Sequence, residues 1–254
     1  TMTSFRAALL GASLLALPAL LVAQVKQPMP NDYPQHSMDR PQPPIVTPGA
    51  ALGDAPSDAV VLFNGKDLSE WVDDSGKPAR WTVKTGWFQV NPGTGGIHTR
   101  RAFGDVQLHV EWSAPTPPTG ESQERGNSGV FLMREYEVQV LDSWHHVTYA
   151  DGAASAIFGQ YPPLVNAVRP PGEWNVYNII FHAPRWNADG TLAAPARMSV
   201  MVNGVLVQDN VSLTGPTAYQ ARPPYARQSD QLPIELQDHQ FPVRFRNVWV
   251  RGIP

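Results

Sequence analysis

Apolar and polar residues alternate over several short stretches of the chain, a pattern that predicts β-strands with one face buried. The clearest stretch covers residues 106–112, VQLHVEW. Its predicted inward residues are Val106, Leu108, Val110 and Trp112, and its predicted outward residues are Gln107, His109 and Glu111. Similar patterns predict further strands at 60–63, 81–83, 87–90, 128–133, 136–141, 174–182, 197–202, 205–207, 233–239 and 243–250.

Turn signals separate these stretches at close spacing. Asn203-Gly204 lies between two alternating runs and predicts a tight hairpin, because both central residues of that turn need positive φ. Gly86 joins two further runs, and a glycine-rich turn covers 93–96. No repeat of fixed period occurs. Many short strands with frequent turns predict an all-β sandwich or barrel.

Polar side chains share one strand face in the segment from Arg125 to Trp144. The period of two places Glu137, Gln139 and Leu141 on one face of the 136–141 strand, opposite its other three residues. Alone, this would indicate a solvated edge strand. The flanking Arg125, Asn127, Asp142 and Trp144 favour a functional site instead.

A second polar face occurs in the 233–239 strand. Ile234 and Leu236 are predicted to point inward, whereas Glu235, Gln237 and His239 share the opposite face. We expect Gln237 and His239 to face Glu137 and Gln139 across one sheet. The long connection after Trp144, up to residue 161, is expected to line the same binding site.

Composition narrows the classes of function and the sources of stability. The chain has 26 prolines, 20 glycines and a formal net charge of −3, without the basic surface that nucleic-acid binding requires. It has no cysteine, which excludes disulfides, thiolate nucleophiles and cysteine-ligated zinc. Stability must therefore come from a packed core, for which Trp71, Trp112 and Trp249 are expected inward members.

The first 56 residues are expected to lie outside the folded domain. Residues 1–23 combine Arg6, an apolar run and a small-residue site ending at Ala23, which predicts a cleaved signal peptide and a secreted or periplasmic protein. No membrane association is expected after cleavage. Residues 24–56 are rich in proline and predict an extended arm, with Tyr33, Ile45 and Val46 as apolar anchors, and 57–254 form the domain.

Several blocks in this order resemble the 3-keto-disaccharide hydrolase family of bacteria, over about residues 59–253. The blocks are Leu62 to Leu68 with Trp71, Gly126 to Val130, Tyr136 to Asp142, Gly172 to Asn175, and Ile234 to His239 with Phe245 to Val248. This resemblance implies a concanavalin A-like jelly roll of two antiparallel sheets, exported to act on glycosides whose sugar carries a 3-ketone. The family usually has glycine after the histidine, where this chain has Gln240.

Two cleavage chemistries fit these residues. Conventional glycoside hydrolysis uses two carboxyl groups, here Glu137 and Asp142, which an extended strand would hold far apart unless it ends or bulges. A 3-keto sugar also permits elimination, because the ketone acidifies the C2 proton. Glu137 would then be the base and His239 the acid or enolate partner. Arg125, Gln139 and Gln237 would be positioning donors. Substrate binding is also assigned to Asn127, Trp144 and Gln160.

Other roles for these residues stay open. Asp142 is as well explained by capping a turn before Ser143, and His239 by a surface position. No cofactor is expected. A divalent metal near His145, His146 and Asp142 is a less favoured alternative, because adjacent histidines on a strand point apart.

Two further functions compete with the enzyme. The sandwich could serve as a non-catalytic carbohydrate-binding module, since one fold supports many functions. Alternatively, the arm could add a strand to a neighbouring subunit and build a homo-oligomer. In each enzymatic or binding alternative, the expected partner is a carbohydrate.

Overall fold

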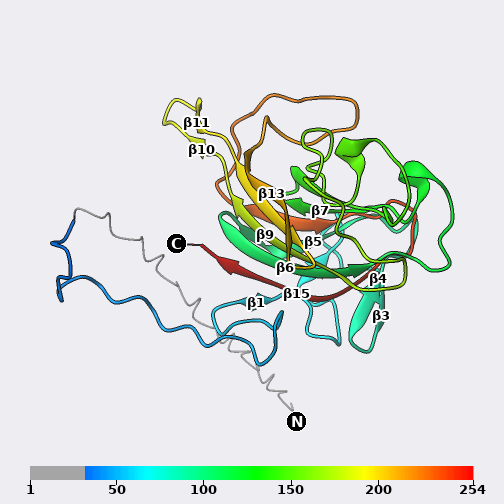
Figure 1. Ribbon diagram of the computed structural model, residues 1–254, viewed down its shortest axis with the longest axis horizontal. Helices are drawn as coiled ribbons and strands as arrows, with labels where there is room; N and C mark the ends of the chain where they lie inside the picture. Colours follow the sequence, from blue (N-terminus) through cyan, green and yellow to red (C-terminus); the bar gives the residue numbers. More distant parts are fainter. Residues whose placement is uncertain (1–31, 254) are drawn as a thin grey trace, which may run out of the picture.

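The computed structural model describes residues 32–253, and this part of the chain forms an antiparallel β-sandwich with two short 3₁₀ helices (Figure 1). The predicted signal peptide and the first residues of the predicted arm lie outside the described range. The strands are β1 (Val60–Val61), β2 (Trp71–Val72), β3 (Thr82–Lys84), β4 (Trp87–Gln89), β5 (Ile97–Phe103), β6 (Val106–Ser113), β7 (Ser128–Leu132), β8 (Tyr136–Val140), β9 (Asn175–His182), β10 (Arg185–Trp186), β11 (Leu192–Ala194), β12 (Arg197–Val202), β13 (Val205–Ser212), β14 (Leu232–Leu236) and β15 (Arg244–Gly252); the helices are η1 (Ser122–Glu124) and η2 (Ala150–Gly152). The predicted all-β jelly-roll sandwich is confirmed.

Two sheets form the layers of the sandwich. The larger sheet has the order β13-β12-β9-β6-β15-β4-β3, with β1 added along β15. The smaller sheet has the order β2-β5-β14-β7-β8, and β10 and β11 form a separate hairpin. Strands that are distant in sequence are neighbours in both sheets, so β14, near the end of the chain, lies between β5 and β7.

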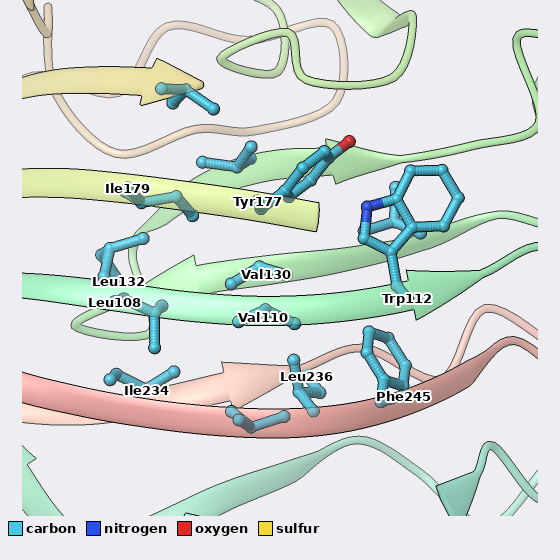
Figure 2. Packing of buried hydrophobic residues seen from close by; sticks show 14 of the residues in the cluster. Leu108, Val110, Trp112, Val130, Leu132, Tyr177, Ile179, Ile234, Leu236 and Phe245 are labelled. Carbon is cyan, nitrogen blue, oxygen red and sulfur yellow. The ribbon is translucent and has the colours of Figure 1, made fainter. Parts of the chain in front are cut away.

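The core fills the space between the sheets. Figure 2 shows Leu108, Val110 and Trp112 of β6 together with Val130 of β7 and Leu236 of β14. All five have at most 1% of their surface exposed, so the alternation predicted for β6 and β14 is confirmed. Burying each large apolar side chain contributes about 1.5–3 kcal/mol, which supplies the stability of a chain without disulfides.

The outer face of the larger sheet differs from the prediction at Trp249. Asn247 has φ 43°, and the register of β15 against β6 shifts between Arg246 and Trp249. This bulge reverses the alternation, so Trp249 stacks on His109 of the outer face with 5.1 Å between ring centroids. Trp249 was predicted to point inward, which is wrong. His109 was predicted to be solvated, yet it is only 1% exposed beneath this stack.

Two further details depart from the sequence pattern. β5 was not predicted, because only its first residues, Ile97 and Thr99, alternate inward before a charged run. Leu141 was placed on the face of Glu137, but it belongs to the hydrophobic core, since β8 ends at Val140. Strand ends therefore limit how far alternation can be extrapolated.

The described part of the arm forms no strand before Val60. Figure 1 shows it, in blue, running away from the sandwich, and the predicted anchor Ile45 is 98% exposed. The arm contacts the larger sheet at Gly53, whose carbonyl accepts hydrogen bonds from Asn247 and from the Trp249 indole. Among residues 32–253, no helix has the length and apolar character that a membrane span needs.

Candidate active site

The candidate site lies on the outer face of the smaller sheet. Phe131 of β7 is the cross-strand partner of both Glu235 on β14 and Glu137 on β8. Cross-strand partners point to the same side of a sheet, and here that side is opposite the core. One row of the outer face therefore reads Glu235, Phe131, Glu137.

The next row contains a glycine at its centre. Gly129 of β7 is paired with Gln139, and its carbonyl accepts a hydrogen bond from the Gln237 amide at 3.0 Å. A Cβ on Gly129 would lie 3.0 Å from the Glu137 carboxyl carbon and 2.7 Å from the Phe131 ring, closer than real Cβ contacts. Glycine at this position therefore leaves the space that the Glu137 side chain occupies.

The predicted polar cluster comes together in one pocket. Asn127, Glu137, Gln139, Gln237 and His239 all line a cavity of about 500 Å³. β14 and β8 are not adjacent, because β7 separates them, but all three present the same face. This size falls within the range of small-molecule sites.

The loops over β8 cover what would otherwise be a free sheet edge. The Gln139 amide donates to the Ala156 carbonyl, and the Phe158 amide donates to the Glu137 carbonyl at 3.2 Å. The Glu137 amide donates to the Thr217 hydroxyl at 3.0 Å. Two loops distant in sequence thus dock on β8, and they place Phe158 and Thr217 in the lining of the pocket.

A chain of amides fixes the end of the pocket near η1. Gln139, only 1% exposed, donates through its side chain to the Gln123 side-chain oxygen at 2.9 Å. Gln123 in turn donates to Thr148 and to the Gly152 carbonyl, while Asn127 donates to the Gln123 carbonyl. Gln139 and Asn127 are therefore held rigidly, as residues that orient a ligand must be.

The loop after β14 supplies the opposite wall. The Gln237 side-chain oxygen is buried with no hydrogen-bond partner among the described residues, and it is available to a ligand donor. Asp238 anchors the loop by accepting from the amides of Gly95 and Gln240. Gln240 has φ 67°, a left-handed backbone conformation that glycine adopts more readily than other residues.

Glu137 is the most perturbed carboxyl of the pocket. Burial raises its pKa to about 8, and the negative charge of Glu235 adds to the effect. The Glu235 carboxylate is itself held by Arg134 at 2.6 Å, from the turn between β7 and β8. A carboxyl with this pKa exchanges a proton near neutral pH, as a general acid or base should.

This pKa makes a prediction about stability. The Glu137 pKa rises on folding from its ordinary 4.5 to about 8, so the folded state binds more protons than the unfolded state between these values. The contribution of Glu137 to the free energy of unfolding is fully present below pH 4.5 and is lost as the pH rises through 8. At about 1.4 kcal/mol per pKa unit, the loss reaches at most about 5 kcal/mol. Glu137→Gln should therefore raise Tm by several degrees at pH 9 and leave it unchanged at pH 4. A Tm difference that does not depend on pH would contradict the assignment.

Four other predicted site residues do not line this pocket. Arg125 and Asp142 form an ion pair at 2.7 Å and line a different cavity of about 300 Å³. Asp142 also accepts from the Trp144 amide, which is the turn-capping role left open by the sequence. Trp144 is 37% exposed, and Gln160 holds a loop through Gly215 and Thr214. Their assigned roles in catalysis and binding gain no support from this geometry.

The ion pair allows a structural role for Asp142 to be tested. Its side chain is 2% exposed, so Asp142→Ala would leave the largely buried Arg125 without its partner. We expect a loss of about 3 kcal/mol in the free energy of unfolding, measured with urea. The control Glu70→Ala removes the exposed pair with Arg101 and should cost about 1 kcal/mol or less. Equal effects of the two substitutions would contradict a structural role for the buried pair.

No group of three or more metal-binding side chains occurs within residues 32–253. His146, from the histidine pair considered for a metal, accepts a hydrogen bond from the Ser122 amide at 2.8 Å.

Several pocket residues were not found by sequence reasoning. They are Gln123, Glu124, Phe131, Tyr149, Phe158, Thr217, Ala218 and Tyr219. Most come from the loops over β8, where no alternation indicates which side chains face the site. The expectation that the connection after Trp144 lines the site is met by Tyr149 and Phe158.

Comparison with known proteins bears directly on this pocket. A family model described as a 3-keto-alpha-glucoside-1,2-lyase-like domain matches residues 58–251, which include both sheets except for Gly252, the last residue of β15. The chain belongs to this family. The resemblance inferred from the five sequence blocks is thereby confirmed, and the 3-keto-alpha-glucoside-1,2-lyase-like domain contains the entire pocket.

Two solved structures are similar to this chain. A Parabacteroides distasonis protein described as a "putative glycosyl hydrolase" is 46% identical, with a TM-score of 0.81 over 85% of this chain and 94% of its own. A second protein of that organism, with the same description, shares the fold at 22% identity and a TM-score of 0.56, over 78% of this chain and 94% of its own. No curated protein sequence matches the chain. Family and neighbours together indicate a protein that acts on or binds glycosides.

Proposed function

We propose that this protein cleaves glycosides of 3-keto sugars in the pocket lined by Glu137, Gln237 and His239. The observation that carries the proposal is the buried Glu137 carboxyl, whose pKa is raised to about 8 within a cavity that also contains an imidazole. Membership of the 3-keto-alpha-glucoside-1,2-lyase-like family supports the choice of a ketone-bearing substrate.

The proposed reaction is an elimination followed by addition of water. Ionised Glu137 removes the proton from C2, which the neighbouring C3 ketone acidifies, and the electron pair passes into the enolate. The enolate expels the C1 oxygen substituent, which takes a proton from His239, and an enone with a C1–C2 double bond remains. Water then adds to C1 and gives one proton to His239, while C2 regains a proton from Glu137. Each group is returned to its starting state.

Burial makes ionised Glu137 a stronger base than a solvated carboxylate. The C2 proton of a ketone is a weak acid, and a base with a higher pKa removes it more readily. A hydrogen-bond donor at the ketone oxygen would stabilise the enolate, and the side-chain amide of Gln237 is one such donor in the pocket. The His239 ring lies parallel to the Phe241 ring, with 6.2 Å between their centroids, and this stacking limits the movement of the imidazole.

The alternative with two carboxyl groups has less support. Asp142, the expected partner of Glu137, is held by Arg125 in another cavity. Glu235 shares the row of Glu137, but Phe131 stands between them and Glu235 is engaged by Arg134. One carboxyl acting on an acidic carbon fits this arrangement better than a carboxyl pair acting on an ordinary glycoside.

The test compares a 3-keto-glycoside with its unoxidised parent, using the purified protein in D₂O. We expect turnover of the 3-keto compound only, with deuterium at C2 of the released sugar by NMR. A slower turnover of substrate deuterated at C2 is the second expected result, and turnover with neither deuterium incorporation nor this isotope effect would refute elimination in favour of direct hydrolysis. If the protein is retained on a column that carries the sugar but turns over neither compound, it is a binding module.

We also propose that the protein acts outside the cytoplasm after cleavage following Ala23. The charged and apolar segments of residues 1–23 support this proposal. N-terminal sequencing of the native protein should begin at Gln24, and a start at Met2 would refute cleavage.

A further inference from the structure

A second hollow adjoins the Glu137 pocket. It has a volume of about 430 Å³ and shares four lining residues with the first cavity: Tyr149, Phe158, Ala218 and Tyr219. The remaining lining residues belong only to the second hollow, and they include Asp151, Gln220 and Arg222. The two hollows therefore adjoin along these four shared residues.

The wall between the two hollows is aromatic. The rings of Tyr149 and Phe158 meet edge to face, with 6.4 Å between their centroids. Tyr219 projects from a tight turn closed by pairing of Ala218 with Ala221, and 69% of its surface is exposed. Exposed aromatic rings beside a cavity offer flat apolar faces on which a ligand ring can stack.

Tyr149 lies at the boundary between the hollows. Burial raises the pKa of its hydroxyl, and charges on Tyr219, Asp151 and Glu137 raise it further, so the hydroxyl is near groups of both cavities. The Tyr149 ring packs on the Cα of Gly152, where any side chain would collide with it. The ring is thereby fixed in orientation.

The polar groups differ between the two hollows. In the first, Gln123 and Gln139 are tied into a hydrogen-bond network and Glu137 is buried, an arrangement suited to one precisely oriented ring. In the second, Gln220 and Arg222 are exposed at the rim. The first hollow is therefore built for chemistry on a defined sugar, and the second for looser contact with what is attached to it.

We propose that the second hollow is the subsite for the leaving group, and that it selects leaving groups containing a ring that stacks on Tyr219. This inference rests on the proposed function, because it assumes that the 3-keto sugar occupies the Glu137 pocket. The ring can be a second sugar or an aryl group, which present the same flat face. The C1 oxygen would then lie at the boundary formed by Tyr149 and Phe158.

The test measures affinity in the Glu137→Gln background, where substrate should not be consumed. Calorimetry would compare a methyl 3-keto-glucoside with a 3-keto-disaccharide and a phenyl 3-keto-glucoside. We expect the ring-bearing compounds to bind about 3- to 10-fold more tightly than the methyl compound. Adding Tyr219→Ala should abolish this ratio, whereas Tyr219→Phe should preserve it. A preference for only one of the two compounds would identify the ring as sugar or aryl.

Equal affinity for methyl and ring-bearing compounds, or a ratio that survives Tyr219→Ala, would overturn the subsite. Circular dichroism of each variant would confirm that it is folded. Turnover by the wild-type protein is assayed in parallel. If wild-type turnover is absent while the affinity ratio is present and depends on Tyr219, then the proposed reaction fails and the ring subsite stands.

Discussion

Replacing Glu137 with glutamine is expected to lower the turnover of a 3-keto-glycoside by about 10²- to 10⁴-fold, the usual contribution of a positioned general base. Glutamine has nearly the same shape and cannot accept the C2 proton, so the pocket should remain intact. The raised pKa also predicts the pH dependence. If ionised Glu137 is the base, kcat/KM should increase with pH and level off above about 8. Stopped assays between pH 5 and 10 would measure both effects.

A matched control is available in the same pocket. Glu124 also lines the cavity but lies at its exposed rim, so Glu124→Gln removes an equal charge without removing the buried base. We expect its kcat/KM to stay close to the wild-type value, with the same pH profile. Full activity of Glu137→Gln, or equal losses in the two variants, would refute the assignment of the base.

Adding one methyl group at Gly129 is expected to reduce activity by about 100-fold, since small misplacements of a catalytic group have effects of this size. The new Cβ would lie 2.7 Å from the Phe131 ring and would press on the Glu137 carboxyl. Both side chains would have to move, because the neighbouring backbone is fixed by sheet hydrogen bonds. Kinetics of Gly129→Ala would show the loss in kcat, and urea unfolding would report any accompanying destabilisation.

Gly252→Ala is the control for alanine in a strand of this sandwich. Gly252 ends β15, and a Cβ there would meet no atom within 4 Å. It should therefore leave kcat and stability nearly unchanged. If Gly129→Ala behaved in the same way, the close approach of β7 to the Glu137 side chain would not matter for the reaction.

The candidate site could be predicted in part because Glu137 and Gln139 lie on β8, and because Gln237 and His239 come directly after β14. Alternation placed Glu137 with Gln139, and Gln237 with His239, on faces opposite apolar residues, and the structure brings all four to one pocket. The same reasoning gave Arg125 and Asp142 to the site, because they flank the strand in sequence. They lie outside the strands, Arg125 before the start of β7 and Asp142 after the end of β8, where the two residues pair with each other.

Residues on loops could not be predicted in this way. Tyr149, Phe158 and Tyr219 reach the pocket because two loops dock along the free edge of β8, the first mainly through backbone hydrogen bonds and the second through the Thr217 hydroxyl. Such bonds are made by groups common to every residue, so they leave no pattern in the sequence. The position of Trp249 could not be predicted either, because a bulge between Arg246 and Trp249 reverses the alternation of inward and outward side chains along β15.

By itself, the sequence determined the all-β class, most strands, the Asn203-Gly204 hairpin and the two polar faces, because side-chain alternation and turn conformations are local properties. Only the tertiary structure decided that β14 lies beside β7, that Gly129 leaves room for Glu137, and that burial beside Glu235 raises the Glu137 pKa. These depend on strand order and on exclusion of water. The pairing of β14 with β7 joins segments about a hundred residues apart in sequence, and no local pattern encodes that pairing or the burial of Glu137 that depends on it.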